Sequence, residues 1–376
     1  MFVQSSIKNN QISARQIAFF AAFLLPVYKL LEVPSLLAGF SKSGLLFPAI
    51  LHFLMQGGLL GAILFIASQS EKTLFERIEQ TLGKWSKLVY IFYGFYFLFY
   101  AVLPLLDAEK FVYAAFFDTA PTLFSFAFFF ILAAFACTKG IKTVGRISDL
   151  ALFLFLAPFL ILLLFSLSEA RINNLLPFFQ GEFGHTRYAF TYTSPHFSDV
   201  LMLFPLIGNL RYQKRDALKI GIGYLSGALC TLLFLAVFYG VYSSIAFRQH
   251  YAFLKIAQYF PALTLIGRVD LLFVYMLCIV FFFFLCTPLQ YGVDFFSSAF
   301  ATQKKMPFAA IVAFSAFVFV LYANPVYNGI YALFCERLFP IFWIFSLLPL
   351  ACFFLPSEPK KAGFTKRENA NKEKKV

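Results

Sequence analysis

Two charged residues lie three positions apart in an apolar stretch near the start of the chain. Lys29 and Glu32 fall between Pro26 and Pro34, and residues three apart on a helical turn share one face. A charge in the middle of a membrane costs on the order of 3 kcal/mol, so such residues usually face a protein interior and mark function. We expect Lys29 to neutralise a ligand carboxylate or Glu32 to meet a ligand ammonium, with a structural Lys29–Glu32 pair as the alternative.

Other apolar segments carry polar residues at helical spacing or a proline break, where freed main-chain groups can bind polar ligand atoms. The candidate substrate-binding residues on these segments are Tyr28, Lys29, Leu31, Glu32, Tyr96, Tyr100, Phe204, Pro205, Gly208, Thr287 and Tyr291. Core packing is the alternative for Tyr96. Asp294 is a candidate for coupling a proton or cation. Asp107 and Glu109 are expected to be solvated at the outer end of the third span, and Asp199 to be an exposed carboxylate in the outer part of the sixth.

No residue pattern indicates an enzyme. The six cysteines form no Cys-x-x-Cys pair and the four histidines form no His-Glu-x-x-His motif. Neither a Gly-x-Ser-x-Gly elbow nor a phosphate-binding loop is found. The sequence therefore predicts no catalytic residue, no metal site and no cofactor.

Composition predicts a multi-pass membrane protein. Hydrophobic residues make up 61% of the 376 residues and charged residues only 13%, which is more apolar surface than one soluble core buries. A helix needs roughly 20 apolar residues to cross a bilayer. That length gives ten candidate spans, at 14–40, 45–69, 86–106, 121–138, 147–168, 190–210, 219–243, 268–300, 307–323 and 334–355.

Basic residues predict the orientation, because cytoplasmic loops carry an excess of Lys and Arg. With the N-terminus inside, 22 of the 31 basic residues lie on the cytoplasmic side and 8 on the outer side. Both termini are then cytoplasmic. The net charge of +13 thus reflects topology and attraction to the anionic headgroups of membrane lipids, and predicts no nucleic-acid partner.

Ten spans with both ends inside divide into five and five, and an odd number per half inverts the second half. We predict one transmembrane domain over 1–356, with repeats at 14–168 and 190–355 and a basic cytoplasmic tail at 357–376. The equivalent helices one and six are the proline-broken ones, at Pro26–Pro34 and around Pro205. Such a pair points to a solute site at the bilayer midplane.

Shorter features complete the expected architecture. Residues 70–83 read as a short amphipathic cytoplasmic helix, and 247–266 as a partial lid over the outer mouth. The pairs Gly57-x-x-x-Gly61 and Gly223-x-x-x-Gly227 permit close helix contact.

Several short motifs carry a resemblance to a known family. They are Ile12-Ser13-x-x-Gln16, the stretch Thr73 to Lys84, Lys139-Gly140-Ile-Lys-Thr-Val-Gly145-Arg146, and Asn174-Leu-Leu-Pro177 with Gly181. In this order and spacing the chain resembles the endospore germination permease family. That family supplies the B-type membrane subunit of nutrient germinant receptors and belongs to the amino acid–polyamine–organocation superfamily.

The resemblance implies an all-α fold of the leucine-transporter type and a subunit that senses a small nutrient, usually an amino acid, in the inner spore membrane. It also implies a larger A-type membrane subunit and a C-type lipoprotein as partners. Relatives in the superfamily commonly bind a carboxylate through glycines in helix one, whereas here no glycine precedes Gly39 in that stretch. The alternatives are a proton- or sodium-coupled amino-acid transporter and a membrane scaffold without a ligand.

Overall fold

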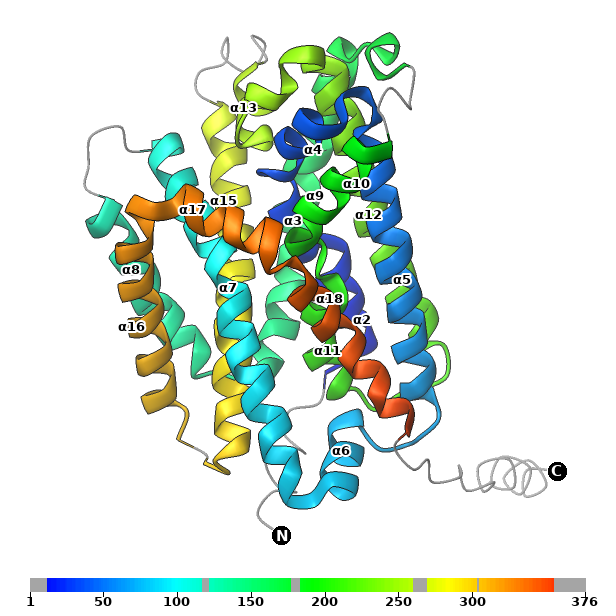
Figure 1. Cartoon of the computed structure of the whole chain (residues 1–376), viewed down its shortest axis with the longest axis vertical. Coiled ribbons are helices and arrows are strands. Elements are labelled where there is room, and N and C mark those ends of the chain that lie inside the picture. Colours follow the sequence, from blue (N-terminus) through cyan, green and yellow to red (C-terminus); the bar gives the residue numbers. More distant parts are fainter. Residues whose placement is uncertain (1–11, 117–121, 177–182, 260–268, 303, 355–376) are drawn as a thin grey trace, which may run out of the picture.

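The computed structural model describes residues 12–116, 122–176, 183–259, 269–302 and 304–354. Within these ranges the regular structure is entirely helical (Figure 1). The basic tail 357–376, and Pro177 and Gly181 of the family-like motif, lie outside the described residues. The longer helices are α5 (Leu46–Ser68), α7 (Ser86–Phe116), α8 (Thr122–Cys137), α9 (Ile141–Glu169), α12 (Asp216–Tyr242), α15 (Val269–Ala299) and α16 (Met306–Ala323).

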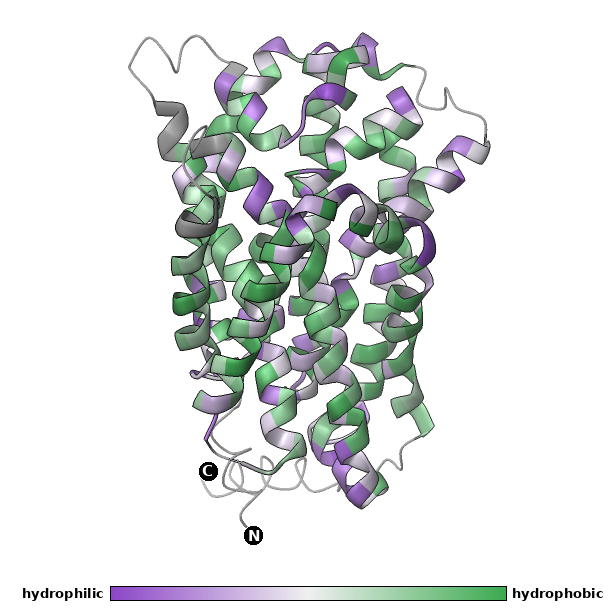
Figure 2. Cartoon of the chain, turned by 60° about the vertical axis from the view of Figure 1, so that its left-hand side comes forward, coloured by the Kyte–Doolittle hydropathy of each residue, from purple (hydrophilic) through white to green (hydrophobic). Residues whose placement is uncertain are grey.

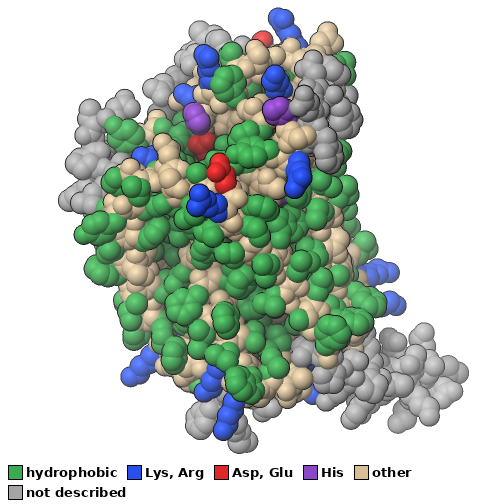
Figure 3. All heavy atoms as spheres, viewed as in Figure 1, with side chains coloured by type: hydrophobic (Ala, Val, Ile, Leu, Met, Phe, Trp, Pro, Cys, Tyr) green, Lys and Arg blue, Asp and Glu red, His purple; other side chains and the backbone are tan. Residues whose placement is uncertain are grey.

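The apolar lengths of these helices confirm a multi-pass membrane protein. Six described stretches are long and apolar enough to cross a bilayer, and the count of ten spans stays a prediction. Hydrophobic residues dominate the middle of the bundle, with hydrophilic residues more frequent toward its ends (Figure 2). One face seen in space-filling form carries a broad apolar belt, with most of its Lys and Arg above and below (Figure 3).

The first span is broken where the sequence predicts. It comprises α2 (Ala14–Phe19), a π-helical turn at Phe20–Leu24, α3 (Leu25–Lys29) and α4 (Val33–Ser41). Pro34 has no N–H to give the carbonyl of Leu30, so the helix cannot continue through this point. The freed carbonyls of Leu30 and Leu31 instead accept the N–H groups of Phe253 and Ala252, at 3.2 and 2.9 Å. These two carbonyls therefore have partners within the protein, as main-chain groups inside a bilayer require.

The bonding partners of this first break come from α13 (Ala252–Tyr259), which lies at one end of the bundle (Figure 1). This helix belongs to the segment 247–266 that was expected to form a partial lid, and 260–266 lie outside the described residues. Helix α13 therefore caps the break by donating its N-terminal N–H groups to the carbonyls of Leu30 and Leu31.

The second break is not where the sequence predicts. Helix α10 (Phe183–Thr193) is separated from α11 (Asp199–Gly208) by a 3₁₀ turn at Ser194–Phe197, so the interruption falls at Pro195. Pro205 lies inside α11. The prediction around Pro205 and Gly208 was wrong because two prolines stand in this segment. Tertiary contacts decide between them: the side-chain oxygen of Gln56 on α5 accepts the Val200 N–H at 3.1 Å and so starts α11.

The short helix α6 (Leu74–Leu82) confirms the amphipathic segment expected at 70–83. Thr73 and Glu76 form a capping box at its start. The Phe75 ring packs against Gly208, where an added Cβ would lie 2.3 Å from the ring. Gly208 therefore serves the packing of α6 under α11.

One of the two glycine pairs brings helices into contact. A Cβ on Gly223 or Gly227 would lie 2.4 or 2.3 Å from the carbonyl oxygens of Ala18 or Ala21, so α12 packs directly on the first span. Gly57 lies under the Tyr224 ring, and a Cβ on Gly61 would meet nothing within 4 Å. The Gly57–Gly61 face of α5 thus leaves open space.

The last span is irregular. It comprises α17 (Tyr327–Ala332), a π-helical turn at Leu333–Arg337, α18 (Phe339–Leu347) and a 3₁₀ segment to Phe354. This span runs obliquely in front of α7 and α11 (Figure 1).

Candidate functional site

A buried ion pair joins the two broken spans. The Lys29 ammonium, at the end of α3, lies 2.5 Å from the carboxylate of Asp199, the first residue of α11. Both side chains are almost fully buried, at 2% and 3% exposure. The rings of Phe53 and Phe197 lie 5.8 and 5.5 Å from the ammonium nitrogen, within the range of a cation–π attraction.

Two sequence expectations fail at this ion pair. A structural Lys29–Glu32 pair was the alternative to ligand binding, and Asp199 was expected to be solvated. The chain leaves helical geometry at Leu30, so the spacing of three no longer places Glu32 on the face of Lys29. Asp199 is buried because α11 begins inside the bundle at the second break, with every residue of α11 buried.

Glu32 faces the other way from the break, toward the α13 end. Its carboxylate lies 3.3 Å from Nδ1 of His250, and it accepts the Ser35 hydroxyl at 3.4 Å. The Glu32 hydrogen bond raises the pKa of His250, whose side chain is 66% exposed. This pair lies between the break and the loop before α13.

A second buried polar cluster surrounds Asp107 on α7. The hydroxyls of Tyr28 and Tyr327 donate to its two carboxylate oxygens at 2.9 and 2.8 Å. His196, in the turn of the second break, lies 3.9 Å from the same carboxylate and is hydrogen-bonded to the Tyr331 hydroxyl at 2.9 Å. The cluster therefore ties α7, both breaks and the last span together.

Asp107 and Glu109 were expected to be wet, and this is wrong. They are 1% and 4% exposed, because α7 continues to Phe116, ten residues beyond the predicted end of the span. Glu109 accepts a hydrogen bond from the Asn324 side chain at 2.7 Å. The residues that sequence reasoning missed are Asp107, His196, Asp199, Tyr327 and Tyr331, and the available signal was a polar residue within an apolar segment.

Tyr96 and Tyr100 lie on the face of α7 that looks toward the breaks. The Tyr96 ring stacks on Phe345 at 4.1 Å, and its buried hydroxyl has no hydrogen-bond partner among the described residues. Ser198, at the second break, is a near neighbour of that hydroxyl, and Tyr100 interacts with Asp199. The Tyr96 hydroxyl therefore lies at the second break, beside Ser198.

The residues of α15 spread along its length. Tyr28 stacks on Phe284 at 5.3 Å, which places this part of α15 against the first break. The Thr287 hydroxyl donates to the carbonyl of Phe283, and the buried Tyr291 hydroxyl has no partner within the described structure. Asp294 pairs with Lys305 near the far end of α15, ten residues, or about 15 Å, beyond Phe284.

The remaining predicted residues have packing contacts. Phe204 lies edge-on to Phe75 at 5.5 Å and against Tyr93 at 5.1 Å. Gly208 is nine residues along α11 from Asp199, about 13 Å away. Leu31 is buried and contributes its carbonyl to the N-terminus of α13. In the described ranges, no group of three or more His, Cys, Asp or Glu side chains assembles a metal site.

Comparison with known proteins decides the family. A family model for spore germination proteins matches residues 49–328, about three quarters of the chain. The chain belongs to the spore germination protein family. Within this family member, Asp107, His196 and Asp199 lie in the matched region, and the first broken span precedes it. No curated protein sequence matches the chain significantly.

Solved structures show the fold of this spore germination protein. MhsT in complex with L-phenylalanine superposes with a TM-score of 0.60 at 12% identity, covering 93% of this chain and 94% of that one. The H236A mutant of the Eremococcus coleocola manganese transporter gives 0.54 at 11% identity, covering 95% and 82%. These likenesses confirm the all-helical leucine-transporter fold.

Proposed function

We propose that this chain binds a small zwitterionic nutrient, an amino acid, between its two broken spans, as the permease-like subunit of a spore germinant receptor. The observation that carries the proposal is the buried Lys29–Asp199 pair, which places one cation and one anion at the two breaks. An amino acid carries the complementary two charges. Lys29 takes the carboxylate and Asp199 takes the ammonium.

Electrostatics favours a ligand with both charges over one with a single charge. Separating a buried ion pair leaves two desolvated charges, which is costly unless each finds a new partner. A zwitterion supplies both partners at once, whereas an amine or an acid alone leaves one protein charge unpaired. The Tyr96 hydroxyl adds a polar contact at the second break.

The comparisons support the ligand class and the setting. MhsT, of the same fold, was crystallised with L-phenylalanine, and the family is that of spore germination proteins. We place the chain in the inner spore membrane with both termini cytoplasmic, beside A-type and C-type receptor subunits.

A second candidate function is amino-acid transport coupled to a proton or to sodium. The solved neighbours include a manganese transporter, and this fold relation favours transport. Uptake of a radiolabelled amino acid into proteoliposomes, driven by an imposed ion gradient, distinguishes a carrier from a sensor.

The binding experiment compares amino acids with analogues that lack one charge. Purified protein in nanodiscs is titrated with each amino acid, its amide and its des-amino acid, and binding is followed by calorimetry. We expect binding of the zwitterion only, and loss of binding in Lys29→Met and Asp199→Asn. Glu32→Gln is the matched control, because Glu32 faces His250, and it retains binding.

Equal affinity of the amide or the des-amino acid for the unmodified protein would refute the two-charge site. This comparison needs no variant, so it remains decisive even where Lys29→Met does not fold.

A further inference from the structure

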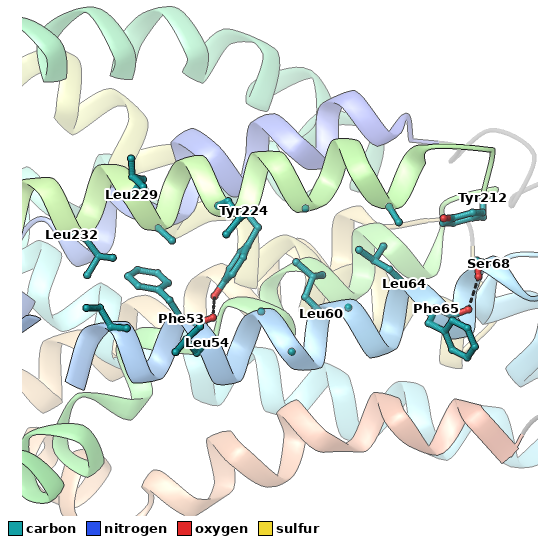
Figure 4. Close-up of a pocket in the computed structure, with 18 residues that line it drawn as sticks. Phe53, Leu54, Leu60, Leu64, Phe65, Ser68, Tyr212, Tyr224, Leu229 and Leu232 are labelled. Carbon is teal, nitrogen blue, oxygen red and sulfur yellow. Dashed lines mark hydrogen bonds between the residues drawn. The ribbon is translucent and has the colours of Figure 1, made fainter. Parts of the chain in front are cut away.

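An apolar groove runs between α5 and α12 (Figure 4). It has a volume of about 650 Å³ and extends along α5 from Ile50 to Ser68. Its lining is apolar apart from the Tyr212, Tyr224 and Ser68 hydroxyls. Lys29, Asp199 and Asp107 do not line the groove, so it is a feature distinct from the proposed nutrient site, although its lining residues Phe53 and Tyr224 border the ion pair.

Glycines leave this groove open. A Cβ placed on Gly58, Gly61 or Gly221 would meet nothing within 4 Å, so these glycines are not required by contacts within the protein. Leu54, Leu229 and other apolar side chains form the remaining walls of the groove. In a bilayer such a surface loses dispersion contacts unless hydrocarbon fills it.

The groove runs along most of α5. Its outermost lining residues on this helix, Ile50 and Ser68, are 18 positions apart, which gives the groove a length of about 27 Å. An extended acyl chain lies along an apolar groove of this length.

One end of the groove is strongly basic. Tyr212 and Ala217 line it there, and the segment 211–219 that contains them carries four basic residues and one acidic residue. Lys214 and Arg215 are exposed and form no ion pair within the described part of the chain. Lys219 is held by Asp216 at 3.2 Å and Arg211 by Glu76 at 3.6 Å, so Lys214 and Arg215 supply the positive charge at this end.

The far end of the groove is lined by Ile50, Phe53, Leu54 and Leu232, with Phe53 and Leu232 at one end of the view and Ser68 and Tyr212 at the other (Figure 4). An apolar channel with cations at one mouth is complementary to a molecule with a long apolar tail and an anionic head.

We propose that this groove binds an anionic phospholipid, with an acyl chain along Gly58, Gly61 and Gly221 and the phosphate at Lys214 and Arg215. The acyl chain then touches Phe53 and Tyr224. The Tyr224 hydroxyl donates to the Phe53 carbonyl at 3.3 Å, and the Phe53 ring faces Lys29 from its other side. Two side chains therefore separate the lipid from the buried ion pair.

The experiment measures lipid binding by native mass spectrometry of the purified protein and by its thermal midpoint in detergent. Phosphatidylglycerol and phosphatidylcholine with identical acyl chains are added in parallel. We expect the protein to retain phosphatidylglycerol at least tenfold more tightly at low salt, given two cations at the headgroup. The preference falls as salt screens the headgroup contact.

Two variants test the headgroup contact and the acyl-chain contact separately. Lys214→Gln with Arg215→Gln abolishes the preference for phosphatidylglycerol, and Lys84→Gln with Lys87→Gln, on the segment before α7, is its matched control. Gly61→Leu fills the groove and weakens binding of both lipids. Gly329→Leu is its control, because a Cβ there also meets nothing within 4 Å.

Three outcomes overturn the proposal. Equal binding of the two lipids to the unmodified protein removes the headgroup site, and unchanged lipid binding in Gly61→Leu removes the acyl site. A dimer that Gly61→Leu dissociates would show that a second copy covers the groove instead. None of these readouts depends on the nutrient ligand, so they test the groove independently of the proposed function.

Discussion

Removing either member of the Lys29–Asp199 pair should destabilise the protein strongly, and removing both charges should restore most of the stability. The perturbations are Lys29→Met, which keeps the length of the side chain without its charge, and Asp199→Asn, which keeps its shape. The two side chains are 2% and 3% exposed. Each single variant therefore leaves a buried charge that neither water nor a partner solvates.

The expected magnitude follows from the geometry of the pair. At a separation of 2.5 Å and an effective dielectric constant of 20, the attraction is about 6–7 kcal/mol. The desolvation of both charges offsets much of this, so the net value of the pair is small. Loss of one partner then costs about 3–5 kcal/mol, whereas the double variant stays near the unmodified protein. With two single losses of about 3–5 kcal/mol and almost no loss in the double variant, the coupling energy of the cycle is about 6–10 kcal/mol.

The assay is a double-mutant cycle on reversible unfolding in mixed micelles, with detergent denaturant as the variable. The control is Lys219→Met, which removes a pair of 3.2 Å whose lysine is 56% exposed and should cost no more than about 1 kcal/mol. Single variants that each lie within about 1 kcal/mol of the unmodified protein would show that the two charges are not paired in a dry interior.

Two other predictions concern helix packing and pH. Gly223→Ala should cost about 1–3 kcal/mol because its Cβ would lie 2.4 Å from the Ala18 carbonyl, and a thermal melt should show Gly221→Ala, which faces open space, to be harmless. The pKa of His250 is raised by Glu32, so the stabilisation is complete below the ordinary pKa of about 6.5 and disappears as the pH rises through the raised value. His250→Gln should therefore lower the melting point at pH 5.5 and not at pH 8.5. The corresponding loss in the free energy of unfolding should be less than about 1 kcal/mol, because the His250 side chain is largely exposed. An equal loss at both pH values would contradict the ion pair.

The sequence predicted the first break and misplaced the second for one physical reason. At Pro26–Pro34 the prolines act on the backbone of their own turn, and this local effect is readable from the chain. In the sixth span Pro195 and Pro205 each satisfy the same local rule. The contact between Gln56 and the Val200 N–H joins residues 144 positions apart, and no local pattern reports it.

The candidate site shows the same division. Lys29 and Tyr28 were predicted from their place in a broken apolar segment, and both lie at the break in contact with charged partners. The partners Asp199 and Asp107 were assigned to water because the predicted spans placed them near helix ends. Where α7 ends and where α11 begins decides whether Asp107 and Asp199 are buried or solvated. Hydropathy does not resolve the end of a span to within a few residues.

The sequence by itself determined that this protein lies in a lipid bilayer, that it is all-helical and which family it belongs to. Composition, the length of apolar runs and short motifs can all be read from contiguous residues. Only the tertiary structure decided which charges meet. Lys29 finds its counter-ion 170 residues away, since a buried charge is neutralised by whatever the packed helices bring within reach and not by its neighbour along the chain.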